Sequence, residues 1–397
     1  MKSRHPSMRL LIGISVVLGT VLVSSLVVTA AKEDREPPVP LAGLTAAEST
    51  RFEEGRRVFQ TQFTPRDGLG PAFNARACEA CHHIPTIGGH GPGYRSNLRY
   101  RENGQEGTGR LFHQLALPVG TPENLAPDAI ISKRRPPTLR GLGLIEAIPE
   151  EDILRNADQD DRDRDGIRGR PAMRDGHLMR FGSQAHVASL FEFVADALRQ
   201  EMGLTSAVPG FNQELSKISL PAFIEARIPN PNLTEQTVRQ LVDFVGFLAP
   251  VPRDSMFSGG QVARGERLFG ELACAKCHVP TFRTSAKPFA RGGDGAMVSS
   301  PALLNQEVAA YSDFLLHDLG ATLDDGVTLG VAKSSEYKTP PLWGLRFHKH
   351  LLLHDGRANN VEQAILYHGG EGARSRQRYL GLPLDDRRAL LEFLETL

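Results

Sequence analysis

Two stretches of the chain place apolar residues on one face at helical spacing. They are RQLVDFVGFL at 239–248 and RALLEFLETL at 388–397, and this period of about 3.6 residues predicts amphipathic helices. Far upstream of each stretch lies a shorter segment that contains a glycine, basic residues and a phenylalanine. These segments are EEGRRVF at 53–59 and ARGERLF at 263–269. The pattern predicts that the two halves of the chain repeat one arrangement, a short helix followed by a closing helix.

The N-terminus departs from this pattern. Three basic residues precede an uninterrupted apolar run at 10–28, and small residues follow at 29–31. This order predicts a secretory signal peptide over residues 1–31, although the run is also long enough for an uncleaved N-terminal anchor. Residues 32–44 contain a polar, proline-rich linker. We therefore expect the body of the protein to be exported to the periplasm, with membrane contact only if the N-terminal segment is uncleaved.

The length of the chain bears on its number of domains, and its charge bears on the kind of partner it can bind. The chain has 397 residues, enough for two domains with separate cores, and its 46 basic and 46 acidic side chains give no net charge. A neutral chain without a basic stretch argues against a nucleic-acid partner.

All four cysteines stand in two copies of one motif, CEACH at 78–82 and CAKCH at 274–278. In an exported chain four cysteines usually form disulfides, and one such motif alone would also fit a redox pair or half a zinc site. Two copies that use every cysteine favour c-type haem, in which two thiols bond to the haem vinyl groups and the next histidine binds the iron. We predict two covalently bound haem c groups, held by Cys78, Cys81 and His82 and by Cys274, Cys277 and His278.

These motifs complete the fold prediction. A haem motif between a short helix and a closing helix is what a cytochrome c domain needs, and long β-branched alternation is scarce. We predict a mainly α fold with two cytochrome c-like helical domains and long loops, at 45–250 and 255–397. The first domain is enlarged by insertions, and a proline-containing hinge joins the two.

One insertion, NADQDDRDRDGIRGR, is strongly acidic. Three aspartates at alternate positions, followed by a glycine, match the first half of a calcium-binding EF-hand loop. They are Asp161, Asp163 and Asp165. The twelfth position of the loop is Ala172 rather than glutamate, so a calcium site and a solvated acidic turn both remain open.

The ordered motifs resemble the dihaem oxidoreductase family, a group of peroxidase-like enzymes sometimes labelled thiol oxidoreductases. The resemblance runs from about Leu44 to the C-terminus and rests on GLGPAFNARACEACH, GLGLIEAIP with DDRDRDGIRGR, LACAKCHVPTFRT, YSDFLLHDLG, and TPPLWGLRF followed by LHDGRANNVEQAILYHGGEG. More distantly the chain is similar to bacterial dihaem cytochrome c peroxidases and to the dihaem enzyme of methylamine utilisation. The resemblance implies that one haem takes electrons from a small periplasmic donor protein. The other haem would meet hydrogen peroxide or another small oxidant.

The resemblance also implies a second iron ligand. In the related peroxidases this ligand closes the helix after the HDG turn, and the matching residue here is His368 in ILYHGGEG. We predict that His278 and His368 bind the second iron from opposite faces. The alternative is that His368 only caps its helix, with Gly369 in the left-handed conformation. His317 and His354 are expected to hydrogen-bond instead of binding iron.

For the first haem the residues force no distal ligand. A peroxidase needs a group above the iron that accepts and returns a proton. Glu146 follows the segment RRPPTLRGLG, which resembles the lining of the reactive haem in the related enzymes. It is the predicted catalytic residue, with Glu150 and Glu151 as alternatives. His90 is either a residue that moves onto the iron or an ordinary loop residue.

Two further features bear on the haem surroundings. Arg135 and Arg140 are predicted to neutralise haem propionates. The related enzymes hold a tryptophan between the haems, but this chain has Ser183 at the matching position and only one tryptophan, Trp343. A tryptophan relay at the family's position is therefore in doubt.

The leading hypothesis is an exported dihaem c-type oxidoreductase, peroxidase-like, in which the C-terminal haem passes electrons to a reactive N-terminal haem. The alternatives are a non-catalytic dihaem electron-transfer cytochrome and a haem enzyme that oxidises a protein substrate. The thiol oxidoreductase label has no support, because haem attachment would use both cysteine pairs.

Overall fold

The computed structural model describes residues 38–93, 96–104, 109–117, 123–212, 232–256 and 259–397. The signal peptide or anchor predicted at 1–31 and the start of the linker lie outside these residues, so those two predictions stay untested. In the described part of the chain, no helix is both long and apolar enough to cross a membrane. The domain boundaries 45–250 and 255–397 also stay a prediction.

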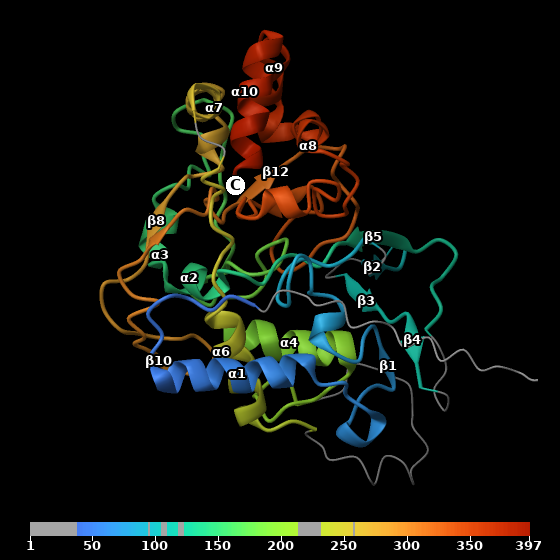
Figure 1. Ribbon diagram of the computed structural model, residues 1–397. Coiled ribbons are helices and arrows are strands. Elements are labelled where there is room, and N and C mark those ends of the chain that lie inside the picture. The colour runs from blue at the N-terminus through green and yellow to red at the C-terminus, as the bar shows by residue number, and fades with distance from the viewer. Residues whose placement is uncertain (1–37, 94–95, 105–108, 118–122, 213–231, 257–258) are drawn as a thin grey trace, which may run out of the picture. The chain divides into compact units, whose positions relative to one another are not determined.

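The first helix pair joins α1 (Ala46–Gln60) to α6 (Glu235–Gly246), and α4 (Leu190–Met202) packs beside α6 (Figure 1). α1 begins with a capping box between Thr45 and Glu48, which satisfies the free N–H groups of its first turn. Gly55 lets the helices touch, because a Cβ there would overlap the carbonyl oxygen of Gln240.

The second helix pair repeats this contact in the other half. α7 (Gly260–Glu271) packs against α10 (Leu384–Glu395), and a Cβ on Gly265 would overlap the carbonyl oxygen of Ala389. Next to each glycine contact, a phenylalanine of the upstream helix meets one of the closing helix. Ring centres are 4.9 Å apart for Phe59 and Phe244, and 5.5 Å apart for Phe269 and Phe393. The internal repeat predicted from the sequence is confirmed for these helices.

Two buried hydrophobic clusters surround the helix pairs. The first is built mainly from α1, α2, α4 and α6 and also takes in Phe282, Phe314 and Trp343 from the second half of the chain. The second surrounds α7 and α10 and includes Tyr311 and Tyr379. Burying each large apolar side chain contributes roughly 1.5–3 kcal/mol, so the shared first cluster binds segments of both halves together.

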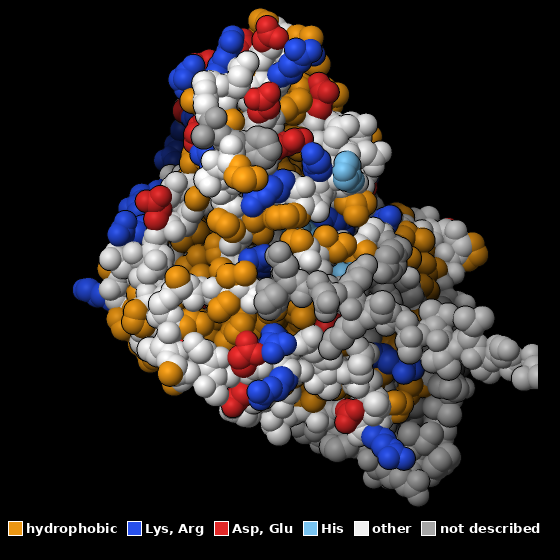
Figure 2. Space-filling view, viewed as in Figure 1, with side chains coloured by type: hydrophobic (Ala, Val, Ile, Leu, Met, Phe, Trp, Pro, Cys, Tyr) orange, Lys and Arg blue, Asp and Glu red, His pale blue; other side chains and the backbone are white. Residues whose placement is uncertain are grey.

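The remaining helical segments are short. They are α2 (Leu142–Ala147), α3 (Glu150–Leu154), α8 (Val361–Tyr367), α9 (Ala373–Leu380) and the single turns η1 (Pro65–Asp67), η2 (Cys78–Ala80), η3 (Cys274–Lys276), η4 (Leu345–Phe347) and η5 (Gly370–Gly372). Figure 2 shows charged side chains over α9 and α10, whereas hydrophobic side chains gather nearer the middle of the same face.

Strands link the loops between these helices. The largest sheet among the described residues is antiparallel, in the order β3 (Arg110–Phe112), β2 (Asn97–Arg101), β5 (Ile130–Arg134), with Leu98 opposite both Phe112 and Lys133. The other sheets have two strands each. They pair β1 (Ala72–Phe73) with β4 (Leu115–Ala116), β6 (Met173–Arg174) with β7 (His177–Leu178), β8 (Phe282–Arg283) with β11 (Glu307–Val308), β9 (Phe289–Ala290) with β10 (Met297–Val298), and β12 (Leu316–Asp318) with β13 (Glu336–Lys338).

The prediction of a mainly α fold made of cytochrome c-like helical domains is therefore wrong in its fold class. Of the described residues 32% are helical and 14% form strands, in several small sheets. The strands were missed because they are only a few residues long, too short for apolar alternation to show. Most are held by pairing between loops, which a local pattern does not reveal.

Candidate haem sites

The two CxxCH motifs adopt the same local structure. Each begins with a single 3₁₀ turn, η2 at Cys78–Ala80 and η3 at Cys274–Lys276. None of the four cysteines forms a disulfide. Burial raises the pKa of the Cys78 and Cys274 thiols to about 12, so these are not the low-pKa thiols of redox-active pairs.

His82 of the first motif is held through one ring nitrogen. Its Nδ1 lies 2.9 Å from the carbonyl oxygen of Pro137 and 3.3 Å from that of Gly89. A carbonyl oxygen only accepts hydrogen bonds, so Nδ1 carries the proton and Nε2 keeps its lone pair. Burial lowers the pKa of His82 to about 4, which keeps the ring neutral. Such a ring is oriented to bind a metal through Nε2.

His278 of the second motif repeats this arrangement. Its Nδ1 lies 2.9 Å from the carbonyl oxygen of Tyr311. Burial is again the main reason that its pKa falls to about 4, helped by the nearby ring of His368. The Nε2 atom is therefore also available to a metal.

His368 stands directly after α8 and faces His278. Its own Nδ1 lies 2.7 Å from the carbonyl oxygen of Ala364, and the centres of the two imidazole rings are 6.5 Å apart. An iron bound by both Nε2 atoms, with bonds of about 2 Å and about 1.2 Å from each nitrogen to its ring centre, would separate the centres by about 6.4 Å. The donor set and spacing therefore fit a haem iron between the two histidines.

The helix-capping alternative for His368 is met in part, and it does not exclude metal binding. Gly369, expected to be left-handed, is extended with φ −100°, and Gly370 has the positive φ of 48° instead. The backbone N–H of His368 does close the helix, bonding to the carbonyl oxygen of Ile365 at 3.1 Å. The ring of His368 adds a side-chain cap through Nδ1 on the Ala364 carbonyl oxygen, which leaves its Nε2 for a metal.

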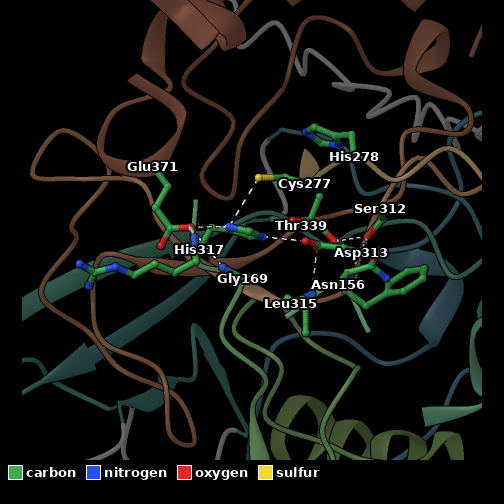
Figure 3. Close-up of polar contacts among 12 residues, drawn as sticks. Asn156, Gly169, Cys277, His278, Ser312, Asp313, Leu315, His317, Thr339 and Glu371 are labelled. Atoms are coloured by element: carbon green, nitrogen blue, oxygen red, sulfur yellow. Dashed lines mark hydrogen bonds and ion pairs between the residues drawn. The ribbon is translucent and has the colours of Figure 1, made fainter. Parts of the chain in front are cut away.

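A buried polar cluster lies beside the second motif (Figure 3). His317 has Nδ1 2.7 Å from Glu371 Oε2 and Nε2 2.8 Å from Asp313 Oδ2. Its Nδ1 is also 3.5 Å from Cys277 Sγ. Burial opposes a charge on His317, but the charges and hydrogen bonds of Asp313 and Cys277 together outweigh it and raise the pKa of His317 well above the usual 6.5. His317 thus hydrogen-bonds through both nitrogens, as expected for a residue that does not bind iron.

Near the first motif lie buried donors without partners. His90 packs its ring on that of His348, with centres 3.5 Å apart, and its Nδ1 has no hydrogen-bond partner. Arg135 bonds the carbonyl oxygen of Leu351 through Nη1, while its Nε and Nη2 are buried without partners. Buried donors are normally satisfied, so the two free nitrogens of Arg135 fit an acceptor such as a haem propionate. Arg140 instead donates to the carbonyl oxygen of Ala249 at 2.8 Å.

Glu146 is buried, and both of its carboxylate oxygens have partners. Oε1 accepts the backbone N–H of Leu190 at 2.7 Å, at the start of α4, and Oε2 accepts Arg291 Nε at 2.9 Å. Its side chain is only 7% exposed. These contacts tie α2 to the second half of the chain, and the catalytic role of Glu146 stays a prediction. Of the alternatives, Glu150 accepts the backbone N–H of Leu178 at 3.3 Å.

The acidic insertion docks on the second haem motif. Lys276, inside CAKCH, places Nζ 3.0 Å from carboxylate oxygens of both Asp163 and Asp165. The group of acidic residues close enough to share a metal ion consists of Asp158, Asp161 and Asp163, so Asp158 takes the place expected for Asp165. The calcium site stays a prediction.

Trp343 lies where segments from the two halves meet. It is 4% exposed, and a Cβ on Gly141 would touch its ring. The neighbouring Leu342 donates its N–H to the carbonyl oxygen of Ala310 at 2.9 Å. Ala310 precedes Tyr311, which holds His278, and Gly141 follows the 137–140 segment, whose first residue holds His82. Trp343 thus packs between the segments that orient the two motif histidines.

Comparison with protein families identifies the chain as a dihaem protein. A family model described as "Di-haem oxidoreductase, putative peroxidase" matches residues 121–397, which include CAKCH and His368. Similar solved structures include a MauG-like protein associated with microbial copper homeostasis, with 14% identity over 91% of this chain and 92% of that one and a TM-score of 0.40. Another is the hydrazine synthase of Kuenenia stuttgartiensis, with 16% identity over 97% and 100% and a TM-score of 0.35. No curated protein matches the chain. Because the family model covers well over half of the sequence, the chain belongs to the di-haem oxidoreductase family.

Proposed function

We propose that the protein is an exported c-type dihaem oxidoreductase with peroxidase-like activity. In this proposal Cys274 and Cys277 attach a haem that receives electrons from a small periplasmic donor protein. Cys78 and Cys81 attach the haem that meets hydrogen peroxide or another small oxidant. The bound haems would supply one-electron redox chemistry, while the chain orients their ligands and excludes water.

The observation that carries the proposal is the pairing of His278 with His368. Both rings donate Nδ1–H to backbone carbonyl oxygens, and their centres are 6.5 Å apart. Two imidazole ligands leave no open position on the iron, which suits electron transfer rather than substrate binding. The low pKa of His278 favours the neutral, metal-binding form of its ring.

The first site differs in a way that supports a reactive role. His82 is oriented like His278, yet within the described residues no imidazole ring faces it as His368 faces His278. A site with one histidine ligand leaves room for a small oxidant on the other face. The unpaired Nε and Nη2 donors of Arg135 would bind a haem carboxylate at the same site.

Replacing the proposed distal ligand tests the assignment. In the holoprotein, His368→Ala is expected to convert the second haem from low spin to high spin, as seen by optical and EPR spectroscopy. His350→Ala is the matched control, because His350 is an exposed histidine of the same half and should leave both haem spectra unchanged. A low-spin signal that survives in His368→Ala would refute the ligand assignment.

Haem content tests covalent attachment separately. The Cys274→Ala/Cys277→Ala variant is expected to keep half of the haem that resists extraction by acidified organic solvent, measured as pyridine haemochrome against protein concentration. Full retention of unextractable haem would contradict attachment at this motif.

A further inference from the structure

We propose that Glu371 and His317 are positioning residues that hold His368 at the second haem. They form a buried bridge from the distal-ligand segment to the CAKCH motif, and we name this bridge the His317 clamp, made of Asp313, His317 and Glu371. The inference rests on the proposed role of His368 as an iron ligand.

The clamp is buried and charged. The side chains of Asp313, His317 and Glu371 are 1%, 3% and 11% exposed. Each nitrogen of His317 lies within hydrogen-bond distance of a carboxylate, at 2.7 Å and 2.8 Å, so both nitrogens donate and the ring is an imidazolium. A buried pair of this kind has strict geometry, because a misplaced partner leaves an unpaired charge.

One end of the clamp rests on the proximal side of the haem site (Figure 3). The backbone N–H of Asp313 donates to the carbonyl oxygen of Cys277 at 2.8 Å, and Cys277 Sγ is 3.5 Å from His317 Nδ1. Cys277 is the residue before the proximal ligand His278. The position of the clamp is therefore tied to the motif that holds the haem.

The other end holds the segment that follows His368. Glu371, three residues further along, uses its carboxylate to accept the backbone N–H of Arg168 at 2.9 Å and of Asp318 at 3.1 Å, besides the bond from His317. Burial raises the pKa of Glu371, but the contributions that lower it are larger in sum, and the first of these is the hydrogen bond from His317. Two separate segments, 168–169 and 317–318, thus converge on this carboxylate and fix the turn that it belongs to.

Glycines allow the two segments to meet closely enough for this. A Cβ on Gly320 would lie 2.9 Å from the backbone nitrogen of Gly370, and a Cβ on Gly370 would overlap the carbonyl oxygen of Asp318. A Cβ on Gly372 would lie 2.9 Å from Cβ of His368. The HGGEG segment therefore packs closely against the LHDLG segment. Within HGGEG, the side chain of His368 lies against the turn that contains Gly372.

A positioning device is needed here because α8 is short. It has seven residues, and a helix of that length is marginal unless tertiary contacts hold it. His368 follows its last residue, where a helix frays most readily. The contact through Glu371 supplies the restraint that α8 alone lacks.

Substitutions at Glu371 test the inference. Glu371→Ala removes the acceptor for all four donors, which include Gly169 N–H at 3.4 Å. Glu371→Gln keeps an oxygen for the backbone N–H groups but removes the charge. Glu123→Gln is the matched control, because Glu123 binds a buried histidine, His113, at 2.6 Å outside the haem motifs. Low-temperature EPR of each holoprotein measures the low-spin signal of the second haem, and urea unfolding measures its stability.

We expect Glu371→Ala to lose part of the low-spin signal and to broaden the rest, and Glu371→Gln to fall between it and wild type. Glu123→Gln should match wild type in EPR while losing stability. If Glu371→Ala does not fold, Glu371→Gln alone decides. Unchanged EPR in the Glu371 variants, together with loss of the low-spin signal in His368→Ala, would overturn the positioning role while leaving the proposed ligand intact. An unchanged signal in His368→Ala would instead sink the ligand assignment on which the inference rests.

Discussion

At the level of single residues, the partner of the Nδ1 atom distinguishes the three proposed iron ligands from His317. His82, His278 and His368 all place Nδ1 against a backbone carbonyl oxygen, which leaves Nε2 free. His317 has a carboxylate at each nitrogen and is therefore committed to charge pairing. The same side chain thus has different roles, set by local hydrogen bonds.

The His317–Glu371 pair carries a pH prediction. Glu371 has a pKa below its usual 4.5, so its stabilising contribution is present above pH 4.5 and is lost as the pH falls through the lowered pKa. His317 has a pKa well above 6.5, so its contribution is present below pH 6.5 and is lost as the pH rises through the raised pKa. Both contributions are complete only between these limits.

We therefore expect wild type to exceed Glu371→Gln in unfolding free energy by about 1–3 kcal/mol in that window, as for a hydrogen bond to a charged group. The difference should shrink at both lower and higher pH. Urea unfolding followed by circular dichroism, at one pH inside the window and one on either side, measures it. A difference that does not change with pH would contradict the pairing.

How far the sequence predicts these residues depends on their spacing. The haem cysteines and motif histidines are contiguous, because one macrocycle must reach all three, so their pattern is visible. The contacts of His317 with two carboxylates were missed. Glu371 is 54 residues away in the chain, and Asp313 reaches His317 through an irregular turn. The contact of His348 with the ring of His90 has no local signal in the sequence.

At the level of elements, the helices were predictable and the strands were not. α6 and α10 show the apolar period that the sequence displays, and their bounds differ from the predicted ranges by a few residues. The strands depend on pairing between distant loops, as in β12 with β13. A repeat of helix pairs with the same glycine contact is also visible in sequence, since EEGRRVF and ARGERLF carry the glycine at the same place.

The glycine contact yields a prediction with an internal control. Gly265→Ala is expected to destabilise the fold by about 1–3 kcal/mol, because the added methyl group would overlap the Ala389 carbonyl oxygen and force α7 from α10. Gly270→Ala lies in the same helix but meets open space. It should be neutral or stabilise by up to about 1 kcal/mol, because alanine favours helix.

Thermal and urea unfolding of the two alanine variants measure this difference directly. Equal stability of Gly265→Ala and Gly270→Ala would show that α7 and α10 do not pack as closely as described.

At the level of the whole molecule, the two haem sites share one plan and differ in one feature. Both motif histidines are oriented by backbone carbonyl oxygens, but among the described residues only His278 of the two has a ring contact with another imidazole. The segments that orient them meet at Trp343, and ion pairs such as Glu146–Arg291 join the halves. This asymmetry favours an enzyme with one electron-transfer site and one reactive site over a carrier with two closed sites.

The most direct test of this asymmetry is low-temperature EPR of the oxidised holoprotein, repeated on the half-reduced protein before and after one equivalent of hydrogen peroxide. Our account predicts one low-spin signal with two histidine ligands and one high-spin signal in the oxidised protein. In the half-reduced protein, the signals should change on adding peroxide. Two low-spin signals that do not respond to peroxide would contradict it and would favour the non-catalytic electron-transfer cytochrome.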